Sequence, residues 1–184
     1  RSGVPVAPGL LLDQVGISHT LDSLVRDALT LQLARSGVPD GFETLLAKSF
    51  RIAQHNGEPD ALAALLDIGT ALEIPFLDDE TIRTALWTLP NNEERLLTCL
   101  IRHLGALRIE KERPVLENML MTGADLPLGR YFALVNALLR LGGTASEQAL
   151  THLAARLDRA PDRKVPRVFR DYVDAAVRYL RGET

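Results

Sequence analysis

The chain has 184 residues, of which 46% are hydrophobic and 24% charged, and its formal net charge is −3. This balance is typical of a folded globular protein; it argues against a disordered segment and against a protein whose main partner is nucleic acid. No apolar run reaches the ~18 residues that a membrane-spanning helix needs, and a single cysteine, Cys99, excludes an internal disulfide framework.

The chain opens with RSGVPVAPG, a proline- and glycine-rich stretch, so we interpret residues 1–17 as a linker and residues 18–184 as one domain. In that domain almost every segment places apolar residues at helical spacing. Capping residues, glycines and prolines then delimit nine expected helices. Their ranges are 18–37, 40–57, 58–72, 78–90, 91–107, 114–123, 128–143, 144–157 and 168–180.

Several helix starts carry a capping signal. Asp40 and Glu43 are three residues apart, as are Thr144 and Glu147, which is the spacing of a capping box. Acidic residues from Asp78 onward open the fourth expected helix. The last expected helix has the clearest amphipathic pattern, with an apolar stripe predicted to be buried that consists of Val168, Phe169, Tyr172, Val173, Ala176 and Leu180.

No segment alternates with period two between turn dipeptides, so the sequence predicts an all-α fold of about nine helices. Gly37, Gly69, Gly105 and Gly142 are 32, 36 and 37 residues apart, close to the period of helical-hairpin repeats. The segments that flank these four glycines barely match one another in sequence. An irregular helical bundle and solenoid-like stacked helix pairs therefore both fit.

The chain has few residues whose pattern indicates a reactive or metal-binding site. The four histidines lie on four different expected helices, and none forms a metal-ligand pair with another histidine or with the cysteine, so we predict no metal site and no cofactor. Cys99 is near the middle of a helix, where a lowered thiol pKa has no obvious cause except His103 four residues on. We predict a structural cysteine rather than a nucleophile.

The segment IRHLGAL is the most informative part of that helix. Its apolar stripe is centred on Leu100 and Leu104, which puts His103 at the edge of the stripe and Gly105 toward the other edge. One interpretation is a half-buried boundary histidine beside a glycine that ends the helix or allows tight packing. The other is a small docking site, in which His103 is a polar rim, Leu104 an apolar anchor and Gly105 an open stretch of backbone.

The basic residues are unevenly divided: eighteen are arginine and three, Lys48, Lys111 and Lys164, are lysine. A GC-rich genome explains this bias, and so does selection against nucleophilic amines near lysine-modifying chemistry. Residues 156–181 hold eight basic and four acidic residues, a pattern typical of a solvated helix face.

His103, Leu104 and Gly105, in an all-helical domain after a Pro/Gly linker, resemble the XL-box ubiquitin ligase domain of XopL-type effectors, which plant-pathogenic bacteria secrete through a type III system. The resemblance implies a ligase of non-RING, non-HECT type that binds a ubiquitin-charged conjugating enzyme (E2) and promotes direct transfer of ubiquitin to a substrate lysine. It makes His103, Leu104 and Gly105 candidate E2-binding residues. It also implies that the protein acts in the host cytoplasm. The implied partners are a host E2, ubiquitin and a host substrate protein, and an N-terminal repeat region would select that substrate.

Two other functions fit the residues. A non-catalytic α-helical scaffold would present a groove to a partner helix or peptide. A nucleic-acid-binding helical repeat would use residues 156–181 and bind with a steep dependence on salt, but the acidic total disfavours it.

Overall fold

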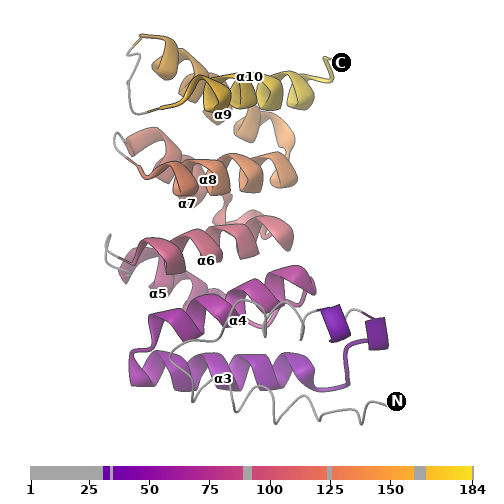
Figure 1. The fold of residues 1–184 in the computed structure, drawn as a ribbon. Coiled ribbons are helices and arrows are strands. Elements are labelled where there is room, and N and C mark those ends of the chain that lie inside the picture. Colours follow the sequence, from indigo (N-terminus) through magenta and orange to yellow (C-terminus); the bar gives the residue numbers. More distant parts are fainter. Residues whose placement is uncertain (1–30, 34, 89–92, 124–125, 160–164, 184) are drawn as a thin grey trace. The chain divides into compact units, whose positions relative to one another are not determined.

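The computed structural model describes residues 31–33, 35–88, 93–123, 126–159 and 165–183 (Figure 1). These residues form helices and loops with no strand among them, which confirms the predicted all-α class. Residues 1–17, the predicted linker, and most of the first expected helix lie outside the described ranges. The helices are α3 (Phe42–Asn56), α4 (Pro59–Ala71), α5 (Asp79–Thr88), α6 (Glu94–Ala106), the 3-10 helix η1 (Glu110–Glu112), α7 (Arg113–Thr122), α8 (Leu128–Leu141), α9 (Gly143–Arg159) and α10 (Arg167–Arg181).

The chain groups into two compact units, Arg1–His103 and Leu104–Thr184, with the division inside α6. The first unit contains α3, α4, α5 and most of α6, and the second contains η1 and α7 to α10. Within the described ranges, no helix is both long and apolar enough to cross a membrane.

The first unit is built on α3 and α4, which pack against each other. The inward side of α3 buries Phe42, Leu46 and Phe50, as its helical spacing predicts. The ring of Phe50 lies 5.8 Å from that of Phe76 in an edge-on arrangement. In α4 every residue from Leu62 to Gly69 except Asp67 is buried, so this helix is the apolar centre of the unit.

The two ends of α3 agree only partly with the sequence. The helix begins at Phe42, and its N-cap is Gly41 in the left-handed region, so the capping box predicted from Asp40 and Glu43 is wrong. The other end is as expected: Gly57 adopts φ of 68°, and its N–H bonds the carbonyls of Ala53 and Gln54.

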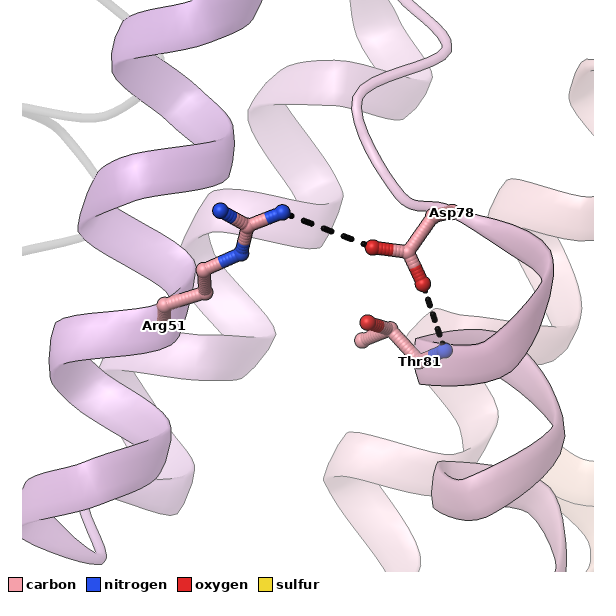
Figure 2. A network of polar contacts seen from close by, with 3 residues as sticks. All are labelled: Arg51, Asp78 and Thr81. Carbon is pink, nitrogen blue, oxygen red and sulfur yellow. Dashed lines mark hydrogen bonds and ion pairs between the residues drawn. The ribbon is translucent and has the colours of Figure 1, made fainter.

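The predicted acidic start of α5 is confirmed by Asp78. Its Oδ1 accepts a hydrogen bond of 2.7 Å from the backbone N–H of Thr81, and its Oδ2 lies 3.5 Å from the guanidinium of Arg51 on α3 (Figure 2). These bonds lower the pKa of the Asp78 carboxyl, chiefly through the backbone N–H of Thr81. Asp78 therefore caps α5 and connects it to α3.

Replacing this cap gives a first prediction. Asp78→Ala is expected to lower the free energy of unfolding by about 1 kcal/mol, because the first turn of α5 loses its acceptor. Asp78→Asn is the matched control, since it keeps an acceptor oxygen and should lose less. Because the folded pKa is lowered, the contribution of the charge is present above the usual pKa of 3.8 and disappears as the pH falls through the folded value. Urea unfolding of the wild type, Asp78→Ala and Asp78→Asn at pH 7 measures the effect. Equal free energies of unfolding for the wild type and Asp78→Ala would contradict the prediction.

The second unit has an aromatic centre. Phe169 of α10 is fully buried, with the rings of Tyr131 and Phe132 of α8 at 5.6 Å and 4.8 Å. α10 packs on α9 and α8, and α7 packs on the same two helices (Figure 1). These contacts bury the inward sides of all four helices in one core.

Arginine side chains close two helix ends in this unit. The guanidinium of Arg156 on α9 donates to the carbonyls of Met121 and Leu120 at 2.8 Å and 3.0 Å, in the last turn of α7. Arg113 of α7 donates to the carbonyl of Leu141, the last residue of α8, at 3.1 Å. Such carbonyls have no partner within their own helix, and a planar fork of donors can satisfy two at once. Arg156, which reaches two such carbonyls, thus has a structural reason that lysine would not meet.

Two sequence-based expectations fail in this unit. α9 already begins at Gly143, so Thr144 lies inside the helix, and Glu147 binds Arg181 of α10 at 2.9 Å rather than completing a capping box. Val168 was predicted to be buried but is 73% exposed. The buried stripe of α10 is centred between Phe169 and Val173, and Val168 lies about 125° around the helix from that centre.

Candidate functional site

The three candidate residues lie together near the end of α6, and all are buried. His103 and Leu104 are 0% exposed, and Gly105 is also buried. The prediction that His103 is a boundary residue is therefore wrong, because the ring points into the core of the first unit. Leu104 is buried as its position in the stripe predicts. A role for these residues in binding an E2 stays a prediction.

His103 is held by one hydrogen bond whose direction can be assigned. Its Nδ1 lies 3.1 Å from Oγ1 of Thr70, and that hydroxyl donates to the carbonyl of Leu66 at 2.7 Å. A hydroxyl has a single proton, so Nδ1 of His103 must be the donor to Thr70. Nε2 is then the unprotonated nitrogen, buried and without a hydrogen-bond partner among the described residues.

The surroundings of His103 are apolar. The ring of Phe76 lies 5.1 Å away, and a Cβ on Gly69 would sit 3.1 Å from Cε1 of His103. Burial lowers the pKa of His103 to about 4, because the charged imidazolium would lose its hydration without gaining a partner. His103 is therefore a neutral core residue at physiological pH, with no access to a substrate.

Cys99 lies one turn before His103 and is 3% exposed. Burial raises its thiol pKa to about 12, and the negative charge of Asp67 adds to the effect. The thiolate is the reactive form, so Cys99 is chemically inert at neutral pH. This agrees with the predicted structural cysteine and removes His103 as a cause of activation.

Gly105 belongs to the second unit, where it allows the last turn of α6 to approach α8 closely. A Cβ at this position would lie 2.5 Å from Cα of Ala137 and 2.7 Å from its Cβ. The interpretation of Gly105 as a tight-packing glycine fits this contact. The other interpretation, an open backbone that a partner could reach, does not fit, because α8 covers Gly105.

The outward side of α6 carries charge instead. Arg95 is exposed and pairs with Asp60 of α4 at 2.8 Å, and Arg102 is also exposed. Nowhere in the described parts of the chain do three or more His, Cys, Asp or Glu side chains gather as metal ligands would. The outward side of α6 is therefore charged, whereas Cys99 and His103 on its buried side are unreactive.

Sequence reasoning did not find the partners of these residues. Thr70 and Phe76 contact His103 from about thirty positions away in the chain, and Asp67 lies equally far from Cys99. The one signal available was Gly69, whose missing side chain makes room for Phe76.

Comparisons with protein-family models, with curated proteins and with solved structures find no significant match to this chain.

Proposed function

We propose that this chain is a ubiquitin ligase domain of the XL-box kind, which binds a ubiquitin-charged E2 and promotes direct transfer of ubiquitin to a lysine of a host substrate in the host cytoplasm. The resemblance at His103, Leu104 and Gly105, in an all-helical chain, carries the proposal. The inert, buried Cys99 supports it, since a ligase of this kind forms no thioester of its own.

In this mechanism the protein acts by holding the charged E2 and the substrate amine in position. The amine of the substrate lysine attacks the carbonyl of the E2–ubiquitin thioester, the C–S bond breaks, and an amide forms as the amine loses a proton. Holding the charged E2 near the amine raises the effective concentration of the reactants. The buried His103, Leu104 and Gly105 would act as positioning residues, because they fix α6 and so the exposed side chains Arg95 and Arg102 on its outward side.

An in-vitro ubiquitination assay with E1, a panel of E2 enzymes, ubiquitin and ATP tests the proposal. We expect polyubiquitin chains with the wild type, and unchanged activity in Cys99→Ala, since no ubiquitin passes through Cys99. No chains with any E2 would contradict the ligase function. Loss of activity in a folded Cys99→Ala variant would contradict the direct transfer.

A second pair of variants asks whether the outward side of α6 contacts the E2. Arg102→Glu is expected to lower the rate of chain formation about tenfold, because reversing a charge at the contact slows association. Arg159→Glu, an exposed arginine at the end of α9, is the matched control and should keep full activity. Equal rates in the two variants would exclude Arg102 from the contact.

The scaffold remains the second candidate, and one observation favours it. α10 exposes Val168 and Tyr179, which are 73% and 75% accessible, in a chain without a reactive group at the candidate site. A scaffold gives no chains in the assay. The nucleic-acid alternative has less support, since Arg156 and Arg181 of the basic region are bound to other helices.

A further inference from the structure

The outward side of α10 carries an apolar stripe that consists of Val168, Tyr172, Ala175 and Tyr179, which we call the α10 stripe. Val168 and Tyr179 are 73% and 75% exposed, Ala175 is exposed, and Tyr172 is half-buried. The spacings of four, three and four residues place all of them within an arc of about 60°. A large exposed side chain is ordinary when it stands alone, but a continuous row along one helix indicates a contact surface.

The stripe is held rigidly on the second unit. The hydroxyl of Tyr172 donates to Oδ1 of Asn136 on α8 at 2.5 Å, and its ring lies 5.4 Å from that of Phe132. On the other side of α10, Arg181 binds Glu147 and Thr151 of α9 at 2.9 Å and 3.2 Å. Few side chains would need to be ordered on binding, which lowers the entropic cost of a contact here.

Charged residues line one flank of the stripe. Asp171 and Arg178 are exposed, and they lie seven residues apart on the same side of the helix. Asp171 is 3.9 Å from Arg167 on its own helix, with 67% and 93% of the two side chains exposed. An exposed pair at this distance contributes little, so Asp171 is available to a second partner.

The apolar spacing reads the same when the helix is reversed, because four, three and four residues are symmetric about the point between Val173 and Asp174. Asp171 and Arg178 are centred one residue further on, between Asp174 and Ala175, and carry opposite charges. Two copies of α10 in antiparallel orientation would set Val168 against Tyr179 and Tyr172 against Ala175. The same arrangement brings Asp171 of one copy close to Arg178 of the other, and each contact occurs twice.

We propose that the α10 stripe binds a second copy of this chain, α10 against α10, antiparallel about a two-fold axis near Val173. A two-fold interface uses the same patch on both subunits, which the symmetry of the stripe provides. The row from Val168 to Tyr179 is about 16 Å long. An interface of that length lies at the small end of specific contacts, below about 1,200 Å², so the dimer dissociates on dilution. The inference does not depend on the ligase function.

Sedimentation equilibrium of the 184-residue chain tests the proposal. Between about 5 μM and about 500 μM, the average mass should rise from the monomer value of 20.2 kDa toward twice that value. Val168→Glu should stay monomeric and remain folded, because Val168 is 73% exposed. Ile52→Glu on α3, where the side chain is 51% exposed, is the matched control and should dimerise like the wild type.

A charge exchange tests the antiparallel register. Asp171→Arg and Arg178→Asp should each weaken the dimer about tenfold, because two attractive pairs become repulsive. The double variant Asp171→Arg/Arg178→Asp should restore the wild-type dissociation constant. A monomer at every concentration, a dimer that survives Val168→Glu, or single variants without rescue would each overturn the proposal.

Discussion

Gly105→Ala is expected to lower the free energy of unfolding by about 2 kcal/mol, although alanine is the better helix former. The added Cβ would lie 2.5 Å from Cα of Ala137, and neither atom is at the end of a flexible side chain. The two helix backbones must therefore separate, which opens gaps among the buried side chains around them. Chemical denaturation followed by circular dichroism measures the loss.

Gly129→Ala is the matched control for this prediction. Gly129 also lies in a helix of the second unit, α8, but a Cβ there would meet none of the described atoms within 4 Å. We expect a gain of about 0.5 kcal/mol, because alanine loses less backbone freedom than glycine on folding. Equal effects of the two substitutions would show that packing against Ala137 does not decide the stability of α6.

His103 should make the protein sensitive to mild acid. Burial lowers its pKa from 6.5 to about 4, so between these values the unfolded chain binds a proton that the folded chain does not. The contribution of the neutral His103 to the free energy of unfolding is fully present above pH 6.5 and decreases as the pH falls toward 4. Below pH 4 the titration of this residue lowers the free energy of unfolding no further. One pKa unit corresponds to about 1.4 kcal/mol, so the loss between pH 7 and pH 5 is about 2 kcal/mol.

His103→Leu isolates this effect from the titration of carboxylates. It replaces the imidazole with a side chain of similar volume that does not titrate, while Thr70 keeps its bond to the carbonyl of Leu66. Urea unfolding at pH 7 and pH 5 should show a loss about 2 kcal/mol smaller in the variant than in the wild type. The same pH dependence in both proteins would contradict a neutral, buried His103.

These variants also bear on how His103, Leu104 and Gly105 act in the proposed ligase. A triple change of His103, Leu104 and Gly105 alters three buried positions, so lost activity would reflect a displaced α6 as readily as a lost contact. Arg102→Glu changes the exposed side and leaves the core intact. Comparing the triple variant with Arg102→Glu therefore distinguishes a role in positioning α6 from a direct contact with the E2.

Helix positions followed from the sequence because their signals are local. Apolar spacing predicted α3 to α10, and Gly57 ended α3 as expected. The exposure of single residues followed less well: His103 was placed at a boundary and Val168 in the core, and both predictions were wrong. Periodicity gives the direction of a side chain from its own helix axis. It does not say which other helices cover that direction.

The equally spaced glycines show the same limit. Gly69 makes room for Phe76, Gly105 for Ala137, and Gly142 takes a positive φ of 67° just after α8. Their similar spacing therefore hides two different physical needs, room for a neighbouring residue and a positive φ. Composition, likewise, could not show that Arg156 and Arg113 donate hydrogen bonds to carbonyls at helix ends.

Those helix-end arginines have a consequence for the order in which the second unit opens. Arg156 joins α9 to the last turn of α7, and Arg113 joins α7 to the end of α8. The terminal turns of α7 and α8 cannot fray alone, since each would first have to release a side chain of a neighbouring helix. Amide hydrogens near these ends should then exchange with solvent together with those of the helix interiors, as one cooperative block, rather than in the graded manner of free helix termini.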